Sequence, residues 1–206
     1  MELITIEDHF VDSSINWWTG KNENGGCEII NGAYIIQHTR ETDDYSVCMT
    51  LSIVESKAYL MEASFTFLNG YTKNGFGFLW GQKSNSEGEE AYAGFHYFVI
   101  SASGKFVIRS YNPVTKIAEP VKDWTDSAFI NKGENQVNIL KIMKFDDTID
   151  KKLYFLINDQ IVFQSDYLPF FGYETGFILF QNMKISIDYF KTNFYFDQSL
   201  TTNKSY

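Results

Sequence analysis

The sequence has little positive charge, because 17 Lys and Arg stand against 26 Asp and Glu and give a net charge of −9. Nucleic-acid binding needs a basic patch that neutralises phosphates, so the composition argues against such a partner. No apolar run approaches the roughly 18 residues of a membrane helix. The acidic start of the chain has neither the charged nor the apolar segment of a signal peptide. We therefore expect a soluble cytoplasmic protein, or an extracellular module if the chain is excised from a longer one.

Cysteine is also rare. Cys27 and Cys48 are the only two cysteines in the chain, and they permit at most one disulfide. A domain of this length does not need such a bridge, so two buried free thiols are the expectation, with the disulfide as the alternative. No Cys-x-x-Cys spacing occurs, so the cysteines indicate no metal site.

A long 3.6-residue periodicity is missing too, and strand patterns take its place. Within 59–68, for example, Ala63, Phe65 and Phe67 alternate with polar residues, as in a half-buried strand. Asn31-Gly32 and Asn158-Asp159, each between apolar runs, predict tight hairpins. One helical turn is expected within 124–132. The expected strands lie at 29–30, 33–36, 47–54, 59–68, 75–80, 92–101, 105–111, near 117, 136–144, 153–157, 161–164, 176–180 and 185–194.

About a dozen short strands joined by tight turns predict an all-β fold, a sandwich of two antiparallel sheets. The length suits a single domain, which we assign to residues 1–196, with a polar tail or linker stub at 197–206. Adjacent residues of an extended segment face opposite ways, so one of Trp17 and Trp18 should be buried and the other exposed.

The alternation also sorts side chains between faces of the sheets. Phe65, Phe78, Phe98 and Ile108 share the apolar phase of their strands and should be buried together, whereas Leu79 and Tyr97 should face the other way. The glycines in 75–81 have two interpretations. They relieve crowding where a sheet bends, or they form the floor of a groove on that second face.

Several fragments occur in an order that resembles a known superfamily. They are FVD at 10–12, WW at 17–18, INGAY at 30–34, GFGFLWG at 75–81, YFVIS at 97–101, GKF at 104–106, LYFLIN at 153–158 and IDYF at 187–190. This order resembles the concanavalin A-like lectin/glucanase jelly rolls, in particular laminin-G-like and 3-keto-disaccharide-hydrolase-like bacterial modules. The resemblance implies a jelly-roll sandwich that binds carbohydrate on a concave sheet or at its rim.

On this basis we expect a non-catalytic module whose partner is a glycan or a protein surface. The alternatives are a hydrolase or lyase related to the 3-keto-disaccharide hydrolases, and an interaction or sensor domain of a larger bacterial protein. Tyrosine rings suit stacking against sugars, and arginine offers a planar fork of donors. The candidate ligand-binding residues are Tyr97, Arg109, Tyr111, Leu79, Gly77 and Glu62.

The catalytic signature of laminarinase-type hydrolases, Glu-x-Asp-x-x-Glu on one strand, is incomplete. The nearest match begins at Glu41, continues with Asp43, ends in Ser46 and lies in a loop-like stretch, so no catalytic residue is assigned. His96 falls on the inward phase of its strand and is expected to be a core or rim histidine.

No cofactor is required by the sequence, although calcium is the remaining candidate. The densest carboxylate cluster is Asp146, Asp147 and Asp150, and calcium prefers such oxygen ligands. Aspartates in a turn also cap backbone amides, which explains the same cluster without a metal.

Overall fold

The computed structural model describes residues 2–11, 15–51, 53, 55–83, 94–145 and 151–196, except for the side chains of Cys48 and Phe196. In these residues it contains fifteen β-strands and no helix. The predicted all-β class is therefore confirmed. Cys27 is a buried free thiol, whereas the side chain of Cys48 and the tail at 197–206 lie outside the described residues.

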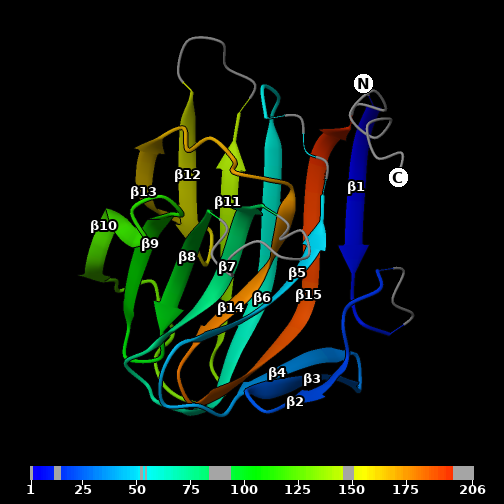
Figure 1. Cartoon of the computed structure of the whole chain (residues 1–206), viewed down its shortest axis with the longest axis vertical. Coiled ribbons are helices and arrows are strands. Elements are labelled where there is room, and N and C mark those ends of the chain that lie inside the picture. Colours follow the sequence, from blue (N-terminus) through cyan, green and yellow to red (C-terminus); the bar gives the residue numbers. More distant parts are fainter. Residues whose placement is uncertain are drawn as a thin grey trace.

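Nine strands form the first sheet, here called the large sheet, in the order β13-β12-β11-β6-β15-β4-β3-β2, with β1 paired to β15 (Figure 1). Its strands are β1 (Glu2–Asp8), β2 (Gly20–Asn22), β3 (Gly25–Ile30), β4 (Ala33–His38), β6 (Tyr59–Gly70), β11 (Val137–Lys144), β12 (Lys152–Ile157), β13 (Gln160–Asp166) and β15 (Met183–Phe196).

Six strands form the second sheet, here called the small sheet, in the order β10-β9-β8-β7-β14-β5. Its strands are β5 (Asp44–Thr50), β7 (Gly75–Gln82), β8 (Phe95–Ser101), β9 (Lys105–Asn112), β10 (Ile117–Asp126) and β14 (Glu174–Phe180). The side of the small sheet that faces away from the large sheet is called its outer face below.

The core lies between the two sheets and is mostly aromatic. Phe65, Phe78, Phe98 and Ile108 are all 0% exposed and belong to one cluster, as the alternation predicted. The ring of Phe65 on the large sheet meets that of Phe78 on the small sheet edge-on at 5.4 Å. Full burial of such a side chain contributes about 1.5–3 kcal/mol, so these rings hold the sheets together.

The two predicted hairpin turns have the positive φ angles of type I′ turns. They are 51° at Asn31 with 74° at Gly32, and 49° at Asn158 with 65° at Asp159. The helical turn expected within 124–132 is wrong, because β10 continues its pairing with β9 to Asp126 and turns follow it. Strands β1 and β2 were not expected from the sequence.

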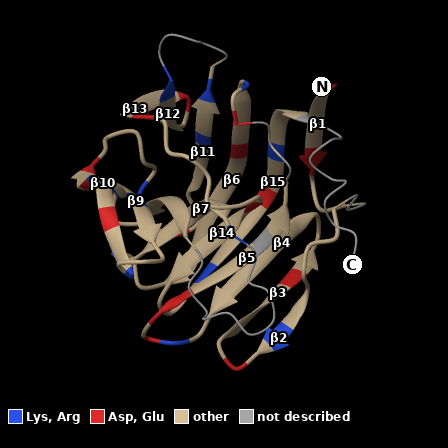
Figure 2. Cartoon of the chain, turned by 45° about the horizontal axis from the view of Figure 1, so that its top comes forward, with Lys and Arg blue, Asp and Glu red and all other residues tan. Residues whose placement is uncertain are grey.

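Positions of Lys and Arg are interspersed with those of Asp and Glu along the strands and loops (Figure 2). Lys105 pairs with Asp126 at 2.8 Å, for example, and Lys191 pairs with Glu7 at 3.3 Å. Surface pairs of this kind contribute little to stability. In the described part of the chain, no helix has the length and hydropathy needed to cross a membrane.

Candidate functional site

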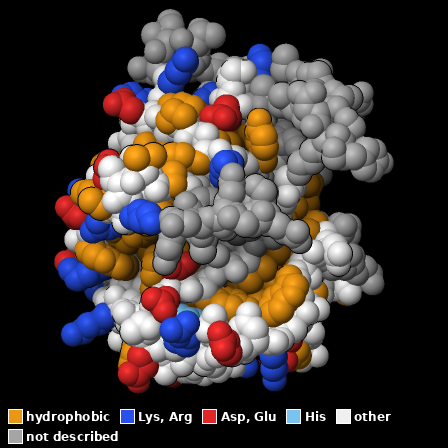
Figure 3. Space-filling model, in the orientation of Figure 1, with side chains coloured by type: hydrophobic (Ala, Val, Ile, Leu, Met, Phe, Trp, Pro, Cys, Tyr) orange, Lys and Arg blue, Asp and Glu red, His pale blue; other side chains and the backbone are white. Residues whose placement is uncertain are grey.

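The outer face of the small sheet carries a second apolar cluster that is separate from the core. We call it the outer cluster; its buried members are Leu79, Tyr97, Val99, Val107 and Ile178. Leu79 and Tyr97 therefore face away from the core, as predicted. Phe95, Ala118 and Phe180 pack against this cluster and are only partly buried. Seen from outside, hydrophobic side chains form patches between charged ones (Figure 3).

Tyr97 is on β8, an inner strand of the small sheet, and its ring lies between two other aromatic rings. Its ring centroid is 5.2 Å from that of Phe180 and 6.2 Å from that of Phe95. Burial raises the pKa of Tyr97 to about 12, although the nearby Arg109 charge acts in the opposite direction. The hydroxyl is therefore neutral at physiological pH and both donates and accepts hydrogen bonds.

Arg109 and Tyr111 follow one another on the same face of β9, and both are partly exposed. The ring of Tyr111 stacks on that of Phe95, with centroids 5.1 Å apart and planes 16° apart. Arg109 donates from Nη1 to the carbonyl oxygen of Ala118 at 2.9 Å and from Nη2 to Asp123 Oδ1 at 3.1 Å. These two bonds fix the orientation of the guanidinium beside the stacked rings.

Gly77 does not form the floor of an open groove. A Cβ atom added to it would lie 2.4 Å from the carbonyl oxygen of Phe98 and 3.0 Å from Cδ1 of Leu140. Leu140 is a core residue on β11 of the large sheet. A Cβ on Gly75 would lie 2.5 Å from Val99 Cγ2. Both contacts are shorter than real Cβ atoms make, so the glycines allow β7 to approach its neighbours closely. Relief of crowding is thus the interpretation that this geometry supports.

Glu62 lies on the large sheet and is not brought together with the other five candidate residues. Its side chain is 15% exposed and lies 2.9 Å from Lys141 Nζ. It also accepts a 2.6 Å hydrogen bond from the hydroxyl of Tyr189, and the pKa of that tyrosine is raised by burial and by the neighbouring carboxylate. These contacts account for Glu62 as part of a polar cluster on the large sheet.

The candidate catalytic and metal residues are placed as follows. Glu41 and Asp43 are exposed and lie in the turn before β5, where Tyr71 and Arg40 contact them at 3.3 Å and 3.2 Å. The calcium candidates Asp146, Asp147 and Asp150 lie outside the described residues. Among the residues that are described, no group of three or more His, Cys, Asp and Glu is arranged to hold a metal ion.

His96 is buried at the end of the core. Its Nε2 lies 3.0 Å from the carbonyl oxygen of Pro169, and its ring packs 5.3 Å from that of Trp80 and 5.1 Å from that of Phe171. Burial lowers the pKa of His96 to about 4. The expectation of a core histidine is confirmed.

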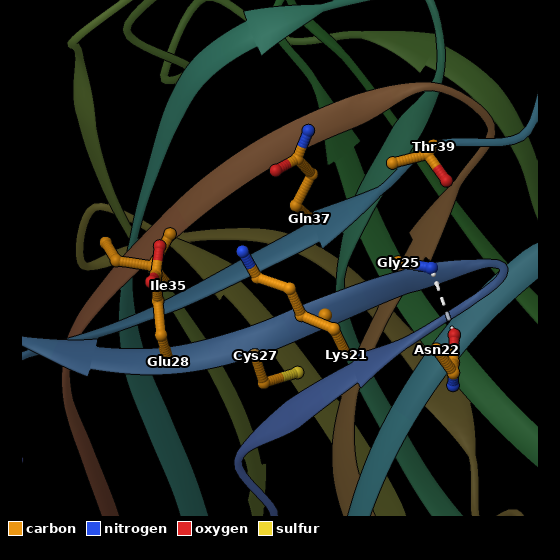
Figure 4. Close-up of a pocket in the computed structure, with 9 residues that line it drawn as sticks. Lys21, Asn22, Gly25, Cys27, Glu28, Ile35, Gln37 and Thr39 are labelled. Carbon is orange, nitrogen blue, oxygen red and sulfur yellow. Dashed lines mark hydrogen bonds between the residues drawn. The ribbon is translucent and has the colours of Figure 1, made fainter.

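Sequence reasoning did not find two cavities beside the short strand β2. The first has a volume of about 250 Å³ and lies over β2, β3 and β4. Figure 4 shows Lys21, Glu28 and Gln37 pointing to one side of this ribbon and Cys27 to the other. A Cβ on Gly26, in the wall of this cavity, would lie 2.8 Å from Lys21 Cγ, so the absence of a side chain there makes room for the side chain of Lys21.

The second cavity, of about 240 Å³, lies at the edge of the small sheet. We call it the rim cleft; its lining residues are Trp18, Asn22, Tyr45, Ser46 and Val47. The prediction for the tryptophan pair is confirmed, because Trp17 is 4% exposed and Trp18 is 44% exposed. The pair was the only sequence signal for this cleft.

No protein-family model matches the sequence, and a search of curated proteins finds no match. Solved structures do match. The carbohydrate recognition domain of Emp47p aligns at 13% identity over 91% of this chain and 93% of that chain, with a TM-score of 0.60. The β-glucanase of Bacillus licheniformis aligns at 8% identity over 91% of this chain and 97% of its own, with a TM-score of 0.62.

A protein of unknown function with a galectin-like fold from Bacillus subtilis aligns at 11% identity over 91% of this chain and 94% of that one, with a TM-score of 0.60. The carbohydrate recognition domain of Emp46p, another match, is known in metal-free and potassium-bound forms. At these identities the likeness establishes the fold alone. The chain has the concanavalin A-like jelly-roll fold of lectins and glucanases.

Proposed function

We propose that the protein is a non-catalytic carbohydrate-binding module whose ligand contacts the outer face of the small sheet at Arg109 and Tyr111. The observation that carries the proposal is the partly exposed stack of Tyr111 on Phe95 beside an oriented guanidinium. Ring faces offer apolar contact to the C–H side of a sugar, and the guanidinium and phenol offer donors to its hydroxyls.

The other candidate residues of this face have supporting roles in the proposal. Tyr97 and Leu79 are 8% and 1% exposed, so they form the support beneath the contact residues. Gly77 keeps β7 close to β8 at the same place. The fold it shares with carbohydrate recognition domains is consistent with the proposal, although the same fold also carries other functions. Catalysis is not proposed, because the match to the hydrolase signature at Glu41 lies in an exposed turn.

A glycan array probed with the intact protein tests the proposal, with and without calcium and potassium. Glycans that bind are then titrated against Arg109→Ala and Tyr111→Ala, each of which should weaken binding by about 1–3 kcal/mol. Tyr173→Ala is the matched control, since Tyr173 is 46% exposed, immediately precedes β14 and should not alter binding. Binding that survives both β9 substitutions in folded protein contradicts the proposed site, and an array without any bound glycan contradicts the function.

A further inference from the structure

An exposed tryptophan is held rigidly at the mouth of the rim cleft. Trp18 is 44% exposed, but the backbone around it is anchored from within. Its carbonyl oxygen accepts a 2.6 Å hydrogen bond from the hydroxyl of Tyr34. The preceding Trp17 donates from Nε1 to Asp8 Oδ2 at 3.2 Å and stacks on Phe177 at 5.0 Å. The indole of Trp18 is thus presented to solvent by a fixed backbone.

The ring of Trp18 is also supported from below. A Cβ on Gly20 would lie 3.0 Å from Trp18 Cζ2, so the indole rests directly on the backbone of β2. When a ligand stacks on a ring fixed in this way, the protein loses little conformational entropy.

Apart from Val47, the remaining lining of the rim cleft is polar but carries no charge at neutral pH. Asn22 contributes an amide and Ser46 a hydroxyl. Tyr45 contributes a phenol whose pKa is raised, chiefly by burial, so it stays neutral. One aromatic face with neutral donors and acceptors suits a neutral polyol better than an anion or a cation.

The rim cleft adjoins the outer face of the small sheet. Ser46 on β5 pairs with Ile178 of the outer cluster, so the two side chains lie on the same face, and Ser46 also lines the cleft. From β9, which carries Arg109 and Tyr111, to β5 there are four inter-strand steps. At about 4.8 Å a step this is a path of roughly 19 Å, longer than a single sugar ring covers.

We infer that the rim cleft is a second saccharide subsite, with Trp18 as its stacking platform, and that the ligand is a neutral oligosaccharide of several hexopyranose units. This inference rests on the proposed function and deepens it. The ligand chain spans the distance from Arg109 and Tyr111 on β9 to Ser46 and Trp18 at the β5 edge. The protein therefore recognises a stretch of a glycan chain and not a terminal monosaccharide alone.

Titration with cello-, laminari-, malto- and manno-oligosaccharides, from disaccharide to hexasaccharide, tests the inference. In at least one series the hexasaccharide should bind the wild-type protein about tenfold or more tightly than the disaccharide. Trp18→Ala should remove this gain and leave disaccharide affinity unchanged, and Trp18→Phe should restore part of the gain. Trp124→Ala is the matched control, because Trp124 is 40% exposed on β10 at the opposite edge of the small sheet.

The outcomes separate this inference from the proposed function. If a disaccharide binds through Arg109 and Tyr111 but affinity does not grow with chain length, or the growth survives in Trp18→Ala, the second subsite is wrong and the proposed function stands. If Trp124→Ala removes the gain instead, the chain runs toward the other edge and the inference is also wrong. If no series binds the wild-type protein, the inference is overturned, whereas the proposed function falls only if the glycan array also shows no bound glycan.

Discussion

The hydroxyl of Tyr34 donates a 2.6 Å hydrogen bond to the carbonyl oxygen of Trp18. Tyr34 is 0% exposed and stacks on Phe10 at 5.5 Å, so this bond connects the interior of the sandwich to an exposed residue. The phenol thereby sets the position of a surface indole from inside the core.

Tyr34→Phe keeps the ring and removes the donor of this bond. Loss of one such hydrogen bond should lower the free energy of unfolding by about 1 kcal/mol. Hexasaccharide affinity should fall as well, because the Trp18 backbone is less restrained, whereas disaccharide affinity should not change. Urea unfolding and calorimetric titration measure the two effects, and a variant equal to wild type in both would show that the bond does not position Trp18.

Alanine at Gly77 should destabilise the fold more than alanine at Gly75. The added Cβ at Gly77 meets a backbone oxygen of Phe98 at 2.4 Å, whereas at Gly75 it meets a methyl group of Val99 at 2.5 Å. A side chain moves aside more easily than a paired strand, so we expect losses of roughly 2–3 kcal/mol and roughly 1 kcal/mol respectively. Equal melting temperatures for the two variants would contradict this account of the glycines.

Acid should destabilise the protein partly through His96. In the unfolded chain this histidine takes up a proton near pH 6.5, but burial lowers its pKa to about 4 in the folded protein. The unfolded state therefore binds more protons between these values, and stability falls as the pH drops through this window. The full effect is about 3 kcal/mol, reached near pH 4. His96→Gln should show a shallower loss of stability between pH 7 and pH 4.5 in chemical unfolding, and an unchanged slope would contradict the assignment.

Glu62→Ala should affect stability and not carbohydrate binding. The substitution leaves Lys141 without its 2.9 Å partner and Tyr189 without the acceptor of its hydroxyl. Lys141 keeps Asp159 at 2.7 Å, so the expected loss is about 1–2 kcal/mol. Glycan affinity should remain that of wild type, because Glu62 lies on the sheet opposite the proposed site; a loss of affinity without a change of fold would return Glu62 to the binding residues.

The faces of the strands could be predicted from the sequence because alternation is local. Phe78 and Leu79 are neighbours in the chain, and their assignment to opposite faces needs only the period of a strand. The partner of each strand is not local in this sense. The chain passes from the large sheet to the small sheet between β6 and β7, so Glu62 and Gly77 lie on different layers although their strands are consecutive.

Features of the site that depend on contacts between distant segments could not be predicted for the same reason. Whether a side chain at Gly77 would fit depends on how closely β8 approaches, which no spacing in the sequence reveals. The rim cleft likewise joins Trp18 to Ser46 from segments that share no motif. An adjacent tryptophan pair predicts that one ring is exposed, but not that it lies beside a cavity.

The pairing of β1 with β15 has a mechanical consequence. Glu2 lies opposite Phe196 and Asp8 lies opposite Phe190. The first residue of β1 and the last residue of β15 therefore meet at one end of the ladder. A pulling force applied through Glu2 and Phe196 would load the hydrogen bonds of the ladder one after another, because these bonds run across the strands. Under tension β1 would therefore separate from β15 at low force, one hydrogen bond after another. The face that carries Arg109 and Tyr111 is on the other sheet and would stay intact.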